Sequence, residues 1–123
     1  MQDDVKKQRV MLIVPSLVGG GEERIAVYLA NKLNRECFEV TLALGAVRGV
    51  YLNDVRTDVD IQEIGGERAR RAIPGIVRVV RAVRPHTIIS FLGFNLAVAL
   101  ARPSFPRGTH VIGREGNFDR FYR

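Results

Sequence analysis

The chain has 123 residues, enough for one domain with a hydrophobic core, and no apolar run is long enough to span a bilayer. A single cysteine, Cys37, excludes an internal disulfide, and two separated histidines provide few soft ligands for a metal site. The net charge of +6 favours an anionic partner. Nucleotides, phosphorylated substrates, anionic membranes and nucleic acid all fit, and the charge does not distinguish between them.

The first patterned stretch, residues 9–32, predicts a strand, a glycine loop and a helix. Val10–Val14 is a short apolar run typical of a buried strand, and Pro15 ends it because proline has no N–H to donate. Glutamates then open a helix over residues 22–33, where they suit the positive end of its dipole. Such an arrangement presents backbone amides to a phosphate, although a turn that needs glycine only for steric reasons fits equally well. The loop contains Gly19, Gly20 and Gly21.

Strands and helices alternate along the rest of the chain. Cys37, His86 and His110 lie at or near predicted strand starts, and we interpret Cys37 as a packing residue and both histidines as structural. Pro74, whose fixed φ suits the first turn of a helix, is expected to lie in the first turn of a helix that ends at Pro85. The other predicted elements are strands at Phe38–Leu44, Val59–Ile64, Thr87–Phe91 and His110–Gly113 and helices near Tyr51–Val55 and at Phe94–Ala101.

The segment Glu67–Arg84 is strongly basic. It has an apolar helical stripe on one side and three arginines on the other, with Arg68, Arg70 and Arg71 just upstream. A solvated helix face is the commoner explanation for such charge. The functional alternative is a docking surface for anionic lipid headgroups or nucleic acid. The three arginines on the helix face are Arg78, Arg81 and Arg84.

This alternation predicts an α/β fold: a Rossmann-like, doubly wound parallel sheet in the order 3-2-1-4-5. Strands one and four are then neighbours, and ligands bind at their carboxyl ends because the chain reverses direction there. Three polar or glycine-bearing segments are expected to converge at this point: Ser16–Gly21, Ser90–Asn95 and Arg114–Asn117.

Several familiar nucleotide and hydrolase motifs are missing. The dinucleotide fingerprint needs a glycine where Arg24 stands, and the P-loop, GxSxG, CxxC and HExxH patterns do not occur. The remaining residues suit the binding and polarisation of a phosphate-bearing ligand more than covalent catalysis. Arg114 and Glu115 could form an acid–base or acceptor-positioning pair, although a surface ion pair is the commoner outcome for such neighbours.

Three segments resemble the family 4 glycosyltransferases. PSLVGGGEERIAVYLANKL resembles the opening of that family, RPHTIISFLGFN resembles its fourth-strand segment, and VIGREGN resembles the segment after its fifth strand. Their order and spacing agree from about Arg9 to Asn117. The chain departs from the family pattern in having no histidine after strand four, in Gly113 where serine is common, and in the placement of Gly116.

This resemblance implies one half of a GT-B fold: the acceptor-side N-terminal domain, residues 1–123, of a retaining glycosyltransferase. The donor domain would lie outside the chain, which alone is expected to be inactive. A nucleotide-sugar would be the donor substrate and a glycan or lipid-linked molecule the acceptor, with no metal or other cofactor. By resemblance the three loop glycines would approach the donor diphosphate and sugar, and the acceptor would contact Ser90, Asn95, Arg114, Glu115 and Asn117.

Two further interpretations stay open. One is a naturally split enzyme whose donor half is a separate chain. The other is a non-catalytic Rossmann-like module that binds a phosphorylated ligand or nucleic acid through its basic surface. For the glycosyltransferase itself, nucleic acid is not an expected partner. We expect a cytoplasmic protein that can lie on the inner face of the membrane through the helix arginines.

Overall fold

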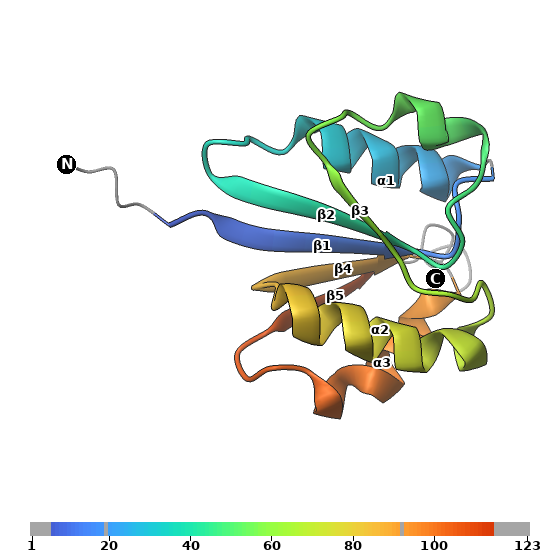
Figure 1. Ribbon diagram of the computed structural model, residues 1–123, viewed down its shortest axis with the longest axis vertical. Helices are drawn as coiled ribbons and strands as arrows, with labels where there is room; N and C mark the ends of the chain where they lie inside the picture. Colours follow the sequence, from blue (N-terminus) through green and yellow to red (C-terminus); the bar gives the residue numbers. More distant parts are fainter. Residues whose placement is uncertain (1–5, 19, 92, 115–123) are drawn as a thin grey trace, which may run out of the picture.

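A computed structural model describes residues 6–18, 20–91 and 93–114 of the chain. Five parallel strands form one sheet in the order β3-β2-β1-β4-β5, so the predicted Rossmann-like α/β fold and its strand order are confirmed (Figure 1). The strands are β1 (Gln8–Val14), β2 (Phe38–Leu44), β3 (Asp60–Glu63), β4 (Thr87–Phe91) and β5 (His110–Arg114).

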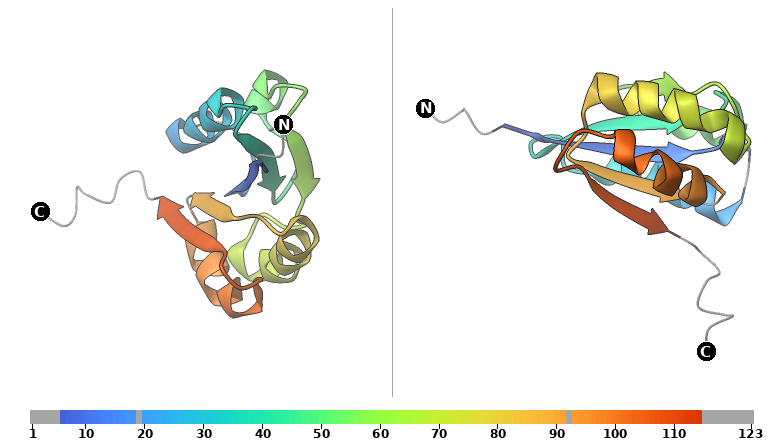
Figure 2. Two further views of the ribbon diagram at one scale, coloured as in Figure 1. Left: turned by 90° about the vertical axis from the view of Figure 1, so that its left-hand side faces the viewer. Right: turned by 90° about the horizontal axis from the view of Figure 1, so that it is seen from below.

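Helices cover both faces of the sheet. The helix α1 (Gly21–Lys32) and the 3₁₀ turn η2 (Val50–Asp54) lie on one face. The helices α2 (Ala69–Val83) and α3 (Phe94–Ala101) lie on the other face, followed by η3 (Arg102–Ser104) (Figure 2). None of the helices in the described ranges is long and apolar enough to cross a membrane.

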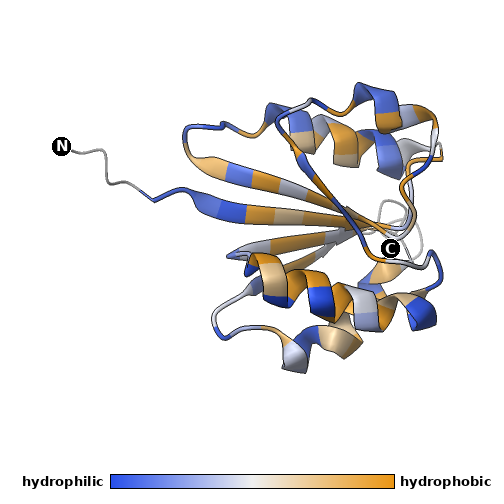
Figure 3. Cartoon of the chain, viewed as in Figure 1, coloured by the Kyte–Doolittle hydropathy of each residue, from blue (hydrophilic) through white to orange (hydrophobic). Residues whose placement is uncertain are grey.

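The central strands supply both halves of the core because successive side chains of a strand point to opposite faces. On β1, Leu12 packs toward α1 and Ile13 packs toward α2 and α3, and both are fully buried. The colouring by hydropathy shows apolar residues along these strands and on the inward sides of the helices (Figure 3). Strands that are buried on both faces read as continuous apolar runs, which is why the sequence identified β1 and β4 well, whereas β2 was recognisable by its alternation and β-branched residues.

Two local predictions are wrong. The helix α2 begins at Ala69, so Pro74 lies inside it and not in its first turn. Burial of Ala72 against the sheet favours the extra turn, even though Pro74 can donate no helical hydrogen bond. Cys37 is exposed and not a packing residue, because it lies in the turn before β2 and not within the strand.

Candidate functional site

The predicted crevice lies at the carboxyl ends of β1 and β4, which are paired neighbours in the sheet. The loop after β1 leads into α1 and the loop after β4 leads into α3, while β5 ends beside them at Arg114. At the switch point of this doubly wound sheet, the first residues of α1 and α3 therefore lie beside the last residue of β5. Of the predicted site residues, Gly19, Glu115 and Asn117 lie outside the described residues.

A chain of hydrogen bonds joins β4, α3 and β5. The Ser90 hydroxyl donates to Asn95 Oδ1 at 2.6 Å, and Asn95 Nδ2 donates to the Arg114 carbonyl at 2.9 Å. Ser90 is only 1% exposed, so it lies beneath the surface and orients Asn95. A Cβ at Gly113 would lie 3.4 Å from Asn95 Oδ1, an ordinary contact, so this arrangement does not itself require a glycine there.

Arg114 continues this polar chain to the opposite face of the sheet. Register pairs Arg114 with Phe91, whose side chain packs on the α1 side, and the Arg114 guanidinium reaches Glu22 Oε2 on α1 at 2.5 Å. The Glu22 side chain is 13% exposed, and its second oxygen, Oε1, is buried without a hydrogen-bond partner in the described structure. From the sequence Glu22 is recognisable only as a helix-dipole residue, and nothing in the local pattern connects it with Arg114.

The glycine loop has two glycines with different constraints. Gly20 has a φ of 142° and a ψ of 170°, a conformation essentially restricted to glycine. Gly21 has an ordinary φ, and a Cβ added there would meet no atom of the described residues within 4 Å. The Glu23 carboxylate lies over Gly20, with Oε1 at 2.7 Å from the place a Cβ would take. Carboxylates from the first turn of α1 therefore already lie near its positive end.

A second ion pair lies at the same edge of the sheet. Arg48, after β2, contacts Glu67, after β3, with 3.0 Å between the guanidinium nitrogen and Glu67 Oε2. The hydrogen bond from Arg48 holds the pKa of the Glu67 carboxyl below its usual value, although partial burial opposes this and Ser16 adds a smaller lowering. Ser16 is itself buried, so the first residue of the predicted crevice segment Ser16–Gly21 lies beneath the surface.

The basic face of α2 is partly engaged with the fold. Arg78 donates to the carbonyls of Glu63 and Ile64, and Arg81 donates to the Ser104 carbonyl at 2.9 Å. Arg84 caps the helix in the left-handed region with a φ of 55°. Two of the three arginines named for membrane contact thus bind the fold through their side chains, and the third caps the helix through its backbone.

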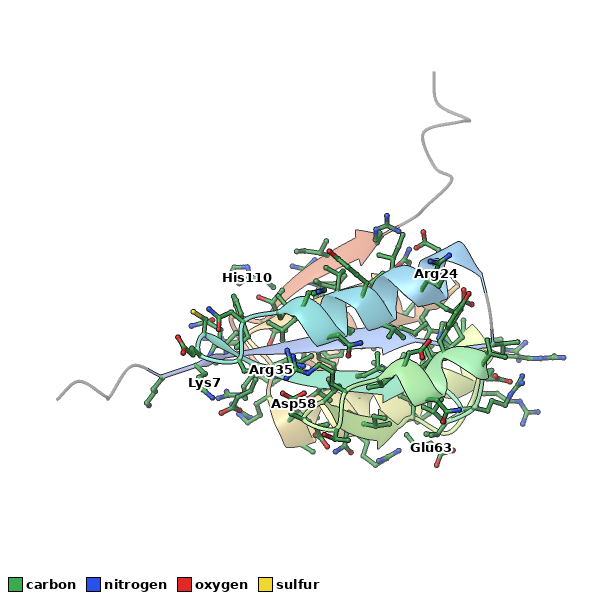
Figure 4. The ribbon with its side chains drawn as sticks, turned by 90° about the horizontal axis from the view of Figure 1, so that it is seen from above. Lys7, Arg24, Arg35, Asp58, Glu63 and His110 are labelled. Carbon is green, nitrogen blue, oxygen red and sulfur yellow. The ribbon has the colours of Figure 1, made fainter. Side chains whose placement is uncertain are left out.

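The other predicted structural residues lie away from the crevice. His86 Nδ1 accepts the Arg9 backbone N–H at 2.9 Å, which supports the structural interpretation of this histidine. His110 lies at the amino end of β5, at the opposite end of the strand from Arg114 (Figure 4). Arg35 and Asp58 form an ion pair beside α1, and Arg24 lies near the start of that helix.

A concavity of about 560 Å³ lies between α1 and η2 and, among the described residues of the predicted crevice, shares only Gly21 with it. Its lining includes Arg24, Tyr28 and Tyr51.

Among the described residues, no group of three or more His, Cys, Asp or Glu side chains could hold a metal ion. Neither a family model nor a curated protein matches this chain.

Proposed function

We propose that this chain is the acceptor-side domain of a retaining, GT-B-type glycosyltransferase that moves a sugar from a nucleotide-sugar to a glycan or lipid-linked acceptor. The observation that supports the proposal best is the contact between its three motif-bearing segments. The segments that resemble the glycosyltransferase family meet at one point, through the polar chain Ser90–Asn95–Arg114–Glu22.

The chemistry of this point suits a polyhydroxylated ligand. Carboxylates are acceptors only, and the half-buried Glu23 carboxylate stands over Gly20 in the glycine loop, so it can accept hydrogen bonds from sugar hydroxyls. The second N–H of the Asn95 amide and the Arg114 guanidinium supply donors at the same place. The backbone amides of the glycine loop would stabilise charge on a leaving phosphate that approaches from the donor side.

The test is an assay of the protein encoded by the complete reading frame, with a panel of nucleotide-sugars such as UDP-glucose, UDP-N-acetylglucosamine and GDP-mannose. Release of UDP or GDP reports transfer to an added acceptor or to water, so the acceptor need not be known. We expect release with at least one donor and retention of anomeric configuration in the product. A reading frame with no donor domain, together with no release after addition of a donor-binding partner, would contradict the proposal.

The variant for this assay is Gly21→Ala, with Leu100→Ala as its control. Gly21 has an ordinary φ and accepts a Cβ without contact to the described residues, whereas Leu100 is an exposed residue of α3 outside the three crevice segments. Only Gly21 lies in the loop proposed to face the sugar, so only Gly21→Ala should lower release, by about tenfold or more, since close substrate approach governs positioning. Gly20→Val is a poorer probe because its φ of 142° would strain valine whatever the ligand does.

A second candidate function is a non-catalytic module that binds a phosphorylated ligand or nucleic acid. The observation that favours it is the exposure of Arg68, Arg70 and Arg71 at the start of α2, a helix with no acidic residue in its first turn. Nucleic-acid binding would fall steeply with salt and tolerate Gly21→Ala, which distinguishes it from sugar transfer.

A further inference from the structure

Exposed aliphatic and basic side chains gather at the carboxyl edge of the sheet, beside the crevice and partly on its first loop. Three valines in this region are exposed although they are apolar: Val18 is 45% exposed, Val47 is 40% and Val50 is 69%. Val18 follows β1, and the other two follow β2. All strands are parallel, so these segments emerge at the same edge (Figure 1).

Backbone hydrogen bonds fix the two valine-bearing loops to each other. Leu17 donates its N–H to the Arg48 carbonyl at 2.9 Å, and Tyr51 donates to the Leu17 carbonyl at 3.2 Å. Gly49 makes this approach possible, because a Cβ there would lie 2.0 Å from the Leu17 carbonyl carbon. The valines therefore stand on a fixed platform.

The start of α2 adds positive charge beside this platform. Gly66 donates to the Gly45 carbonyl at 2.9 Å, and the Arg48–Glu67 ion pair joins the same two loops. The exposed arginines that follow directly, Arg68, Arg70 and Arg71, line a concavity of about 530 Å³. We call the whole surface the edge patch; it comprises Val18, Val47, Val50, Arg68, Arg70 and Arg71.

We propose that the edge patch docks the protein on an anionic lipid bilayer, which goes beyond the sugar chemistry proposed for the crevice. Arginines attract anionic headgroups, and exposed aliphatic side chains beside them gain free energy by entering the boundary between headgroups and acyl chains. The net charge of +6 complements such a surface. The patch contains valines where a nucleic-acid surface would offer aromatic stacking platforms, so lipid is favoured over single-stranded RNA.

The docking site therefore differs from the helix face expected from the sequence. Arg78 and Arg81 are held by backbone carbonyls of their own fold, whereas the arginines of the edge patch stand at the rim with exposed valines beside them. This contrast provides a matched pair of triple variants with the same loss of charge.

The experiment measures partition of the 123-residue chain onto vesicles, by co-sedimentation. Vesicles of phosphatidylglycerol mixed with phosphatidylcholine are compared with phosphatidylcholine alone, and circular dichroism confirms folding of every variant. The unchanged chain should partition onto the anionic vesicles only. R68Q/R70Q/R71Q should weaken partition by about 100-fold, at roughly fivefold for each arginine, whereas R78Q/R81Q/R84Q should weaken it only about two- to threefold through the net charge.

A second matched pair tests the valines. V18Q/V50Q should weaken partition by about tenfold, while L96Q/L100Q, which changes two equally exposed leucines on α3, should leave it unchanged. Equal losses for the two arginine triples, no effect of V18Q/V50Q, or no partition onto anionic vesicles would each overturn the proposal. Tight binding to single-stranded RNA that is insensitive to V18Q/V50Q, without vesicle binding, would assign the patch to nucleic acid instead.

Discussion

Glu22 and Arg114 lie 92 positions apart in the sequence and form an ion pair across the carboxyl edge of the sheet, with 2.5 Å between Glu22 Oε2 and the guanidinium. The pair connects the first turn of α1 with the last residue of β5. Because the Arg114 carbonyl also accepts from Asn95, one residue links the helix layers on the two faces of the sheet. The candidate site is thus held by contacts between elements that are distant in the sequence.

A double-mutant cycle will measure this link. Glu22→Ala and Arg114→Ala should each destabilise the fold, and together they should cost less than the sum, with a coupling free energy of about 1 kcal/mol. The partial exposure of Arg114 keeps the value modest, since its side chain is 37% exposed. Urea unfolding of the four proteins gives the number. Additive losses would show that the pair does not couple the two elements.

The glycine loop should respond differently at its two described glycines. Gly20→Ala should destabilise the chain by about 1–3 kcal/mol, because its φ of 142° is strained for any L side chain. Gly21→Ala should be neutral or stabilising by up to about 1 kcal/mol, since alanine lowers the entropy of the unfolded chain and meets no described atom within 4 Å. Thermal unfolding distinguishes them, and similar losses at both positions would refute this account of the loop.

Gly75 should tolerate alanine badly although it lies inside α2. In an exposed helix, glycine to alanine stabilises by about 1 kcal/mol. Here the added Cβ would lie 1.9 Å from the Ile64 carbonyl oxygen, so α2 must move away from the loop after β3. We expect a net destabilisation of about 1–3 kcal/mol in denaturant unfolding. Gly93→Ala, whose Cβ would meet no atom of the described residues within 4 Å, is the control and should change stability little.

Asp58 should stabilise the fold near neutral pH and lose this contribution in the acid range. Burial acts to raise the pKa of Asp58, but the hydrogen bond and charge of Arg35, with the charge of Arg56, outweigh it, so the pKa lies below its ordinary value. A pKa that is lower in the folded state than in the unfolded state stabilises the fold above the unfolded value. That contribution is lost as the pH falls through the folded value.

The measurement for Asp58 is the free energy of urea unfolding between about pH 6 and about pH 3. Asp58→Asn should be less stable than the unchanged chain at the upper end, and this difference should shrink at the lower end. Glu39→Gln, an exposed change on β2, serves as the control. A difference that stayed constant over the whole range would mean that the Asp58 carboxylate does not act through its charge.

Much of the architecture was readable from the residues because strands buried on both faces leave continuous apolar runs. The bounds of β2, β4 and α3 agree with the prediction, and β1 differs only by its polar first residues. The start of α2 was missed because Pro74 is a strong local signal, while the burial of Ala72 that outweighs it depends on packing against the sheet.

The sequence by itself determined the strand order and the loops that meet at the switch point, since hydrophobic periodicity and the handedness of crossovers are local or topological rules. Tertiary structure alone decided which side chains pair there. The bond of Glu22 with Arg114, the burial of Ser90 and the engagement of Arg78 by carbonyls all depend on strand register and helix position. These are set by packing between distant segments, which no local pattern records.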